Sequence, residues 1–384
     1  MKIRSFTKLF YIFQFFTDFV FIYAVEKLFM LNRGLNLSQI GILLFLWSAM
    51  TLLLEVPSGA IADRWSRRKM LILSGISYSL CYFLWIFSHS FWLFLFGFLL
   101  RTIGSTFSSG TLQAYVYDFL KTKKAENHFE IIWGKGNALR TLGIGIAVAL
   151  GGFISEISFT ITVFLSALPV LTTAIIAFIW PEVEIAQSTQ ETKYWQFVKN
   201  SFKTIKESKV LLRLMIYLAI VLAWLASLEE FNDIYLNSLG FSRSIIGLIF
   251  ALAAAGQALA SSLAHKFKKH SWLIINLSVI ITALIMFTAA IIKHPIMAIG
   301  ILFLGVMMEF VSVIKESIVQ KETKSYQRAT VSSMSGLIMN LIPHQLAFGF
   351  IANYYSFQVG YGFFGIFVLL YFLITLFVPN NKNR

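Results

Sequence analysis

The sequence predicts an all-α integral membrane protein with about twelve transmembrane helices arranged in two six-helix bundles. Hydrophobic residues make up 58% of the 384 residues and charged residues only 13%, and the mean hydropathy is +0.75. A chain this long and this apolar cannot form a soluble core. The apolar runs do not alternate apolar and polar residues as strands of a membrane β-barrel do, so helices are the expected spanning elements.

The spans are expected where long apolar runs lie between polar gaps. They begin near Phe6, Ile40, Met70, Phe91, Ile131, Ile157, Leu211, Ser244, Trp272, Ile296, Ala329 and Gly360. The first run, from Phe6 to Met30, is too long for the apolar region of a signal peptide and has no small-residue cleavage site after it. It is therefore expected to be a retained first helix.

Lysine and arginine are concentrated in every second gap and at both termini. The remaining gaps hold only Arg33, Arg243 and Lys293 of the 32 basic residues. Basic residues concentrate in cytoplasmic loops, so both termini of this multi-pass protein are expected on the cytoplasmic side of a cell membrane. The formal net charge of +14 is explained by this orientation, and no nucleic-acid partner is expected.

The longest polar stretch predicts the domain organisation. It separates an N-terminal six-helix bundle at 1–180 from a C-terminal one at 211–384, with a cytoplasmic linker at 181–210. Four apolar residues of the linker recur at helical spacing with lysines between them: Trp195, Val198, Phe202 and Ile205. This pattern predicts an amphipathic helix in the membrane interface. The alternative is a soluble regulatory segment.

The two halves contain an internal repeat. Gly34, Ser38, Ile40 and Gly41 are matched at a constant offset by Gly240, Ser244, Ile246 and Gly247. Each set leads from an outer loop into the second helix of its half. The segment from Gly59 also has a degraded counterpart that starts at Ser261. Parallel repeats of six spans are one plan of secondary transporters, whose substrate site lies between the repeats.

The segment GAIADRWSRRK resembles the loop between helices two and three of the major facilitator superfamily, whose pattern is G-x-L-x-D-R-x-G-R-R/K. The matching positions are Gly59, Asp63, Arg64, Arg67 and Arg68; Ile61 stands in place of Leu and Ser66 in place of the second Gly. The resemblance covers nearly the whole chain and implies the fold of that superfamily.

In the resembled superfamily this loop is a conformational gate. The resemblance implies that Asp63 pairs with Arg67 and meets the start of the eleventh span near Arg328. Asp118, at the end of the fourth span, is expected to be the acidic partner of the basic cluster. The alternative is a solvated charged turn that serves only topology.

The fifth span has a weaker similarity to the G-x3-G-P-x2-G-G motif of drug antiporters. Gly143, Gly151 and Gly152 match, but Ala147 and Val148 stand where Gly-Pro is expected. Small residues that allow close helix packing account for this run equally well.

Ionisable residues within spans are costly and indicate a proton or substrate pathway. The candidates are Asp18, Arg101, Glu229 and Glu309; they fall in spans 1, 4, 7 and 10, which line the cavity in the resembled superfamily. Asp18 and Arg101 lie at similar depth, so we expect an ion pair, either in the pathway or as a structural salt bridge.

Two further choices concern the C-terminal half. Glu229 is favoured over the adjacent Glu230 as the cavity-facing residue, because successive helical residues diverge by about 100°. Glu309 has no basic residue at comparable depth in its own helix, which suits a proton carrier. The alternative is a glutamate hydrogen-bonded to a neighbouring helix.

Aromatic residues make up 16% of the chain. Trp47, Tyr115 and Trp224 are candidates for a cavity that accepts flat or cationic molecules. Packing within the protein or contact with lipid is the alternative for each of them.

These observations predict a monomeric secondary active transporter that works by alternating access. The expected activity is proton-coupled efflux of a hydrophobic or cationic small molecule; the alternative is a proton-coupled importer or facilitator of a small polar nutrient. Membrane lipid surrounds such a protein. The histidines form no metal-ligand pattern, and no nucleotide-binding or hydrolase motif stands out, so neither cofactor, metal nor catalytic residues are expected.

Overall fold

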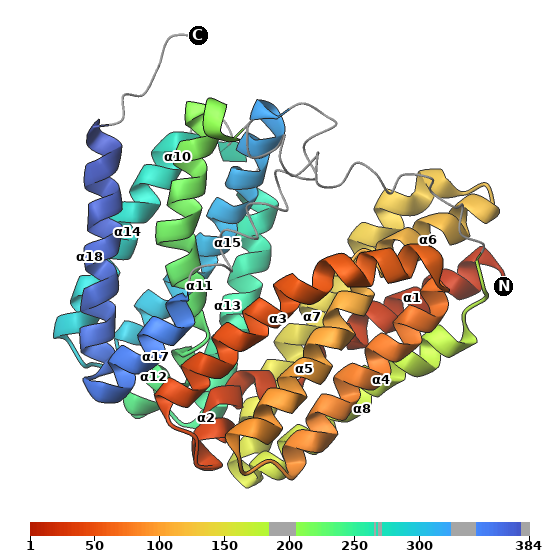
Figure 1. Cartoon of the computed structure of the whole chain (residues 1–384), viewed down its shortest axis with the longest axis horizontal. Helices are drawn as coiled ribbons and strands as arrows, with labels where there is room; N and C mark the ends of the chain where they lie inside the picture. The colour runs from red at the N-terminus through yellow and green to blue at the C-terminus, as the bar shows by residue number, and fades with distance from the viewer. Residues whose placement is uncertain (184–204, 265, 268–270, 324–342, 378–384) are drawn as a thin grey trace. The chain divides into compact units, whose positions relative to one another are not determined.

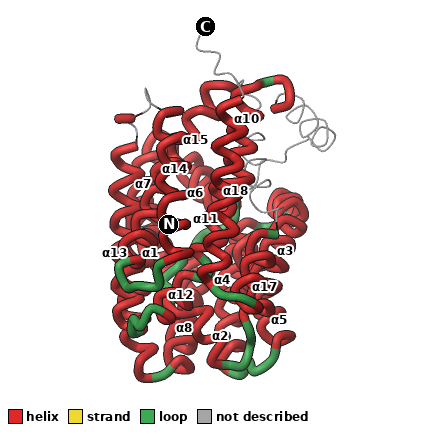
Figure 2. The backbone as a smooth tube through the Cα atoms, turned by 90° about the vertical axis from the view of Figure 1, so that its left-hand side faces the viewer, coloured by secondary structure: helices red, strands yellow, loops and turns green. Residues whose placement is uncertain are grey.

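The computed structural model describes residues 1–183, 205–264, 266–267, 271–323 and 343–377, without the side chains at 56, 57, 59, 60, 62–64 and 374–377. Every regular element among these residues is a helix (Figure 2). Ten helical segments of this part are long and apolar enough to cross a membrane, and a shorter apolar helix covers Phe357–Leu373. The expected all-α membrane fold is confirmed. The start of the eleventh span at Ala329 and most of the linker helix lie outside the described residues.

The chain divides into two compact units. Unit 1 consists of Met1–Leu35, Leu46–Thr189 and Phe241–Ala254, and unit 2 of Asn36–Phe45, Gln190–Gly240 and Ala255–Arg384. The units follow the predicted halves except at the beginnings of two helices, which pack in the opposite unit. The predicted boundaries at 180 and 211 stay a prediction.

Unit 1 contains the helices of the N-terminal half (Figure 1). They are α1 (Ile3–Thr17), η1 (Phe21–Val25), α2 (Glu26–Asn32), most of α3 (Leu37–Arg64), α4 (Arg67–Ile86), α5 (Phe91–Ser108), α6 (Thr111–Thr122), η2 (Glu126–His128), α7 (Phe129–Ile157) and α8 (Phe159–Ile179). Helix α4 packs along both α5 and α8. The core at one end of the unit is aromatic: Phe6 stacks on Phe119, and Tyr115 stacks on Trp180.

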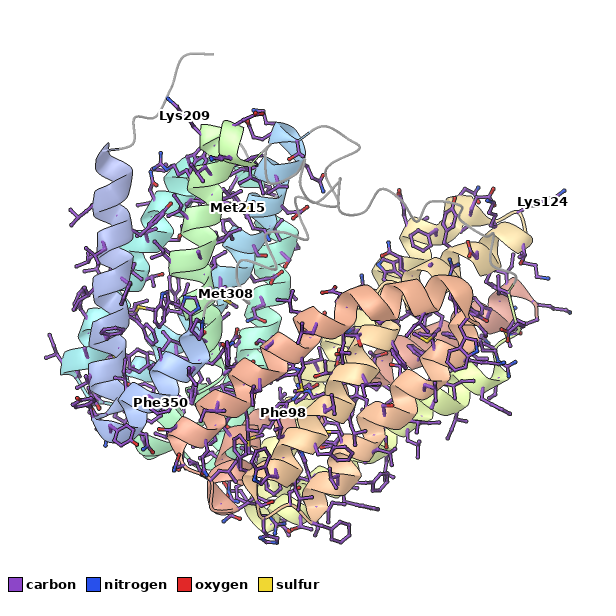
Figure 3. All side chains as sticks on the ribbon, in the orientation of Figure 1. Phe98, Lys124, Lys209, Met215, Met308 and Phe350 are labelled. Atoms are coloured by element: carbon purple, nitrogen blue, oxygen red, sulfur yellow. The ribbon has the colours of Figure 1, made fainter. Side chains whose placement is uncertain are left out.

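Unit 2 contains the helices of the C-terminal half. They are α10 (Lys209–Tyr217), the π-helical turn η3 (Leu218–Leu222), α11 (Ala223–Glu229), α12 (Asn232–Ser238), the later part of α13 (Arg243–Leu263), α14 (Ser271–Ile291), α15 (Met297–Glu322), α17 (His344–Tyr354) and α18 (Phe357–Phe377). Helix α14 packs along α18. Apolar side chains cover the helices outside as well as inside (Figure 3), as lipid contact requires.

The expected first span is present at Ile3–Asn32, but it is not one continuous helix. Helix α1 ends at Thr17, and the chain resumes as the 3₁₀ turn η1 and then α2. Irregular backbone at membrane depth is tolerated only where protein covers it. Here Val20 and Ile22 are fully buried, and the Ile22 N–H donates to the Ser166 hydroxyl at 3.0 Å.

Glycines of α7 make room for this break. A Cβ at Gly143 would collide with the carbonyl oxygen of Phe15, and one at Gly151 with the carbonyl oxygen of Phe21. The run that resembles the antiporter motif thus brings the irregular backbone of the first span against α7. The packing explanation accounts for both glycines.

Gly151→Ala is expected to destabilise the protein by about 1–3 kcal/mol, because the added methyl group cannot fit without moving the first span. Gly145→Ala in the same helix is the matched control: nothing lies within 4 Å of its added Cβ, and alanine is the better helix former. Thermal denaturation in detergent measures both. Equal denaturation temperatures for the two variants would contradict the close approach of η1 to α7.

The internal repeat has the same structural role in both halves. Gly34 and Gly240 end α2 and α12 with φ values of +94° and +93°, where a side chain would be strained. Seven residues later, a Cβ at Gly41 would lie 2.7 Å from the Gln345 carbonyl oxygen of α17, and one at Gly247 would lie 2.6 Å from the Val148 carbonyl oxygen of α7. Each repeat therefore turns the chain and then begins a helix that crosses a partner closely.

The topology expected from the basic residues has a direct test. A reporter inserted after Lys123 or fused after Arg384 should be cytoplasmic, and one inserted at Ser155 or Gln358 should be external, since Lys and Arg are retained on the cytoplasmic side. Accessibility of each reporter to an impermeant reagent in intact cells measures this. A consistent reversal at all four positions would contradict the assignment.

Candidate functional site

Arg101 of α5 lies at the centre of a buried polar site in unit 1. Its Nη1 donates to both carboxylate oxygens of Glu26 in α2, at 3.2 and 3.0 Å. The side chains of Arg101 and Glu26 are 9% and 2% exposed. A charge this deeply buried is tolerated only when it is paired and hydrogen-bonded.

Aromatic rings surround this guanidinium group. Its central carbon lies 4.6 Å from the ring centre of Trp47, 5.0 Å from Tyr23, 5.8 Å from Tyr78 and 5.9 Å from Phe98, which Figure 3 labels. The hydroxyls of Tyr23 and Tyr78 are hydrogen-bonded to each other. Trp47 therefore makes a cation–π contact, and the cation is the protein's own arginine.

The expected ion pair between Asp18 and Arg101 was wrong. Asp18 pairs instead with Arg140 of α7. Asp18 is the C-cap residue of α1 and has non-helical backbone angles, so its side chain does not follow the helical face counted from the sequence. Glu26, at the start of α2, takes the place at Arg101 that was expected for Asp18.

The described part of the signature loop is anchored within unit 1. Arg67 pairs with Asp118 of α6. Arg68 donates to the carbonyl oxygens of Ala177 and Phe178 at the end of α8 and lies 3.6 Å from Glu182. Cations favour helix C-termini. The predicted contacts of Gly59, Asp63, Arg64 and Arg328 lie outside the described side chains.

In unit 2, Glu229 is exposed and lines a small pocket between α11 and α15. Its Oε1 accepts a hydrogen bond from Gln257 Nε2 at 3.3 Å. A Cβ added at Gly305 would make an ordinary contact with Gln257 Nε2, at 3.4 Å. The walls are apolar and include Leu228 and Met308, the latter labelled in Figure 3. The pocket thus combines apolar walls with a carboxylate.

Glu309 of α15 has a different environment from the carboxylates of unit 1. It is partly buried, and its Oε1 accepts a hydrogen bond from the Ser261 hydroxyl of α13 at 2.7 Å. Among the described residues it has no ion pair. The bond is to a neutral group on a neighbouring helix, and it is compatible both with the expected proton carrier and with the alternative considered above.

Comparison with known proteins decides the family. Residues 9–343 match the family model of the Major Facilitator Superfamily. The chain belongs to this superfamily. This major facilitator is therefore a multi-pass membrane protein.

Two curated relatives of this major facilitator match part of it. It is 26% identical over 252 residues to the uncharacterized MFS-type transporter YxaM of Bacillus subtilis (strain 168), covering 63% of this chain and 61% of that protein. It is 32% identical over 143 residues to the tetracycline resistance protein, class B, of Escherichia coli, covering 37% of this chain and 34% of that protein. The chain thus spans less than two thirds of the length of each relative.

Two solved structures share the fold over their full length and over the full length of this chain. The nucleoside transporter NupG has a TM-score of 0.81 at 13% identity, and a D-xylose-proton symporter has a TM-score of 0.77 at 13% identity. At such identities the similarity shows the fold alone.

Two of the three aromatic candidates of this major facilitator lie in packed cores. Tyr115 is fully buried, and its hydroxyl donates to the Pro181 carbonyl oxygen at 2.5 Å. Trp224 is 6% exposed and packs on Phe364 with ring centres 3.7 Å apart. The packing alternative describes both. No cluster of metal-ligating side chains occurs in the residues that the structure describes.

Glu26 is the main residue of the site that the sequence interpretation missed. A signal was present, since the adjacent charges Glu26 and Lys27 interrupt the apolar run of the first span. The structure pairs Glu26 with Lys27 at 3.5 Å as well as with Arg101.

Proposed function

We propose that this major facilitator is a monomeric secondary active transporter that works by alternating access and exports a hydrophobic or cationic small molecule in exchange for protons. The observation that carries the proposal is the environment of Glu309. Asp18 and Glu26 are held in ion pairs with arginines, whereas Glu309 is bonded to the hydroxyl of Ser261. Of these three carboxylates, Glu309 is the one whose described partner is a neutral hydroxyl group, and this is the environment that we assign to a proton carrier.

The pocket at Glu229 supports the substrate class. Its cavity volume in this conformation is only about 20 Å³, so it marks a place where apolar side chains and a carboxylate meet and not a site already open to substrate. Such surroundings favour a molecule that is apolar and positively charged. Partial similarity to a protein named for tetracycline resistance supports export of a drug-like molecule.

Transport in membrane vesicles with an imposed pH gradient tests the proposal. Dyes, antibiotics and sugars are screened for movement in both directions, with and without a protonophore. Export-direction movement of a hydrophobic or cationic compound that stops when the gradient is collapsed is the expected result. Proton-driven uptake of a sugar or nucleoside, with no movement of the cationic compounds, would establish the importer alternative.

We further propose that the signature loop is a gate in which the Arg67–Asp118 pair holds the loop in position. Asp118→Asn is expected to reduce transport severalfold while surface expression stays near normal, because the proposed gate requires the pair in one of the alternating states and not in the other. Glu182→Gln at the neighbouring Arg68 is the control. Unchanged transport in Asp118→Asn would leave the loop with a topological role only.

A further inference from the structure

Helices α3 and α13 begin at equivalent positions of the internal repeat, but their first turns are capped differently. At the start of α3, the Asn36 N–H donates to Gln39 Oε1 and the Gln39 N–H donates to Asn36 Oδ1, both at 2.9 Å. This reciprocal cap is complete within the helix. At the same offset, the positions in α13 are Ser242 and Ile245.

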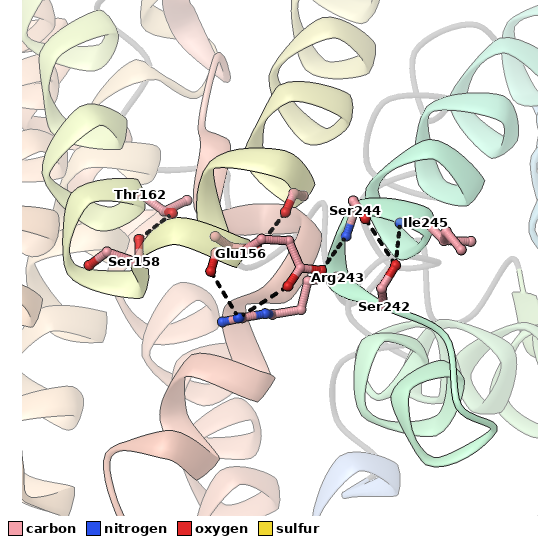
Figure 4. Close-up of polar contacts among 9 residues, drawn as sticks. Glu156, Ser158, Thr162, Ser242, Arg243, Ser244 and Ile245 are labelled. Carbon is pink, nitrogen blue, oxygen red and sulfur yellow. Dashed lines mark hydrogen bonds and ion pairs between the residues drawn. The ribbon is translucent and has the colours of Figure 1, made fainter.

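Ile245 cannot complete such a cap. The Ser242 hydroxyl accepts the Ile245 N–H at 3.4 Å, but isoleucine has no side-chain acceptor to return the bond. Glu156, at the end of α7, supplies a carboxylate instead: its Oε1 accepts the Ser244 N–H at 3.1 Å (Figure 4). A negative charge is favoured at this position because the N-terminus of a helix is positive. The cap of α13 thus comes from another helix.

Arg243 strengthens the same contact. Its Nη2 lies 3.2 Å from Glu156 Oε2 and donates to the Glu156 carbonyl oxygen at 3.4 Å (Figure 4). Its guanidinium carbon lies 4.5 Å from the ring centre of Phe159. The carboxylate of Glu156 therefore bonds to both a backbone N–H and a charged side chain of α13.

Two further features suit this contact to opening and closing. The side chains of Arg243 and Glu156 are 25% and 38% exposed, so water can replace their bonds when they separate; the buried pair of Arg101 and Glu26 has no such replacement. One turn into the helices, α7 and α13 cross at Gly152 and Gly247, where a Cβ on Gly152 would lie 2.6 Å from the Arg243 carbonyl oxygen. The glycines let the ends approach, and the charges hold them.

We propose that Glu156 and Arg243 form a latch that holds the predicted outer ends of α7 and α13 together in this conformation and opens when those ends separate during transport. The proposal rests on the alternating access proposed above. The first part of α13 packs in unit 1 and its remainder in unit 2, so the latch acts on a helix that both units share. The equivalent end of α3 carries its own cap and can separate without losing it.

Cysteine labelling tests the latch. Ser155 is fully buried beside Glu156, and the one native cysteine, Cys81, is buried and is replaced by alanine in the background. In that background, Ser155→Cys should react slowly with an impermeant maleimide. Adding Glu156→Gln, or Arg243→Gln, should raise the reaction rate about tenfold, because a charge-assisted contact is lost. Glu130→Gln, at the exposed opposite end of α7, should leave the rate unchanged.

A charge exchange separates the latch from a general loosening of the fold. Glu156→Arg combined with Arg243→Glu restores the ion pair and should return the labelling rate towards that of the parent. Equal rates in the parent and both single variants would overturn the proposal, as would an exchange variant that labels as fast as the singles. Labelling needs neither substrate nor pH gradient, so a failed transport assay leaves this result standing.

Discussion

Glu309→Gln is expected to reduce pH-driven transport to background while substrate binding and substrate exchange are retained. Glutamine keeps the size of glutamate and can still accept the hydrogen bond that Ser261 donates at 2.7 Å, but it cannot carry a proton. Net transport under a pH gradient requires that proton, whereas exchange of labelled for unlabelled substrate does not. Both assays on the same vesicles measure the difference.

Asp18→Asn is the comparison for Glu309→Gln. Asp18 is already engaged in an ion pair with Arg140, so its substitution should affect coupling less than Glu309→Gln does. Normal pH-driven transport in Glu309→Gln together with its loss in Asp18→Asn would place the proton route in the N-terminal half. Normal transport in both variants would favour a facilitator driven only by its substrate gradient.

Hydropathy and the internal repeat predicted most of the helices because lipid imposes a simple rule. A span needs a long apolar run whatever its partners are, so the beginnings of the spans could be found in one sequence. The repeat of Gly34 and Gly41 in Gly240 and Gly247 likewise reflects backbone demands, a left-handed turn and a close crossing, that few residues other than glycine satisfy.

The break in the first span could not be predicted in this way. Neither proline nor glycine lies between Asp18 and Val25, so nothing local marks the end of α1. The residues that accommodate the break lie far away in the sequence. Gly151 of α7 leaves room for the Phe21 carbonyl oxygen, and the Ser166 hydroxyl accepts a hydrogen bond from the Ile22 N–H. Partners so distant in sequence leave no local pattern, and the pairing of Arg101 was misassigned for that reason.

Glu26→Gln is expected to lower the free energy of unfolding by about 3–5 kcal/mol, because it leaves the charge of Arg101 buried without its counter-charge. The two side chains are 2% and 9% exposed, so water cannot take the place of the carboxylate. Unfolding of the purified protein in mixed micelles with increasing denaturing detergent measures the loss. Glu182→Gln is the matched control, since Glu182 is 51% exposed and lies 3.6 Å from Arg68; a loss of less than about 1 kcal/mol is expected there.

The double variant Glu26→Gln with Arg101→Gln identifies the cause of the expected loss. Removing both charges leaves two neutral amides that can bond to each other, so stability should return most of the way to that of the parent. If the double variant is as unstable as Glu26→Gln, the loss comes from disturbed packing around the break in the first span and not from the unpaired arginine. If Glu26→Gln itself costs no more than Glu182→Gln, Arg101 has another counter-charge, and Asp18, which lies on the other side of the break, is then the residue to replace.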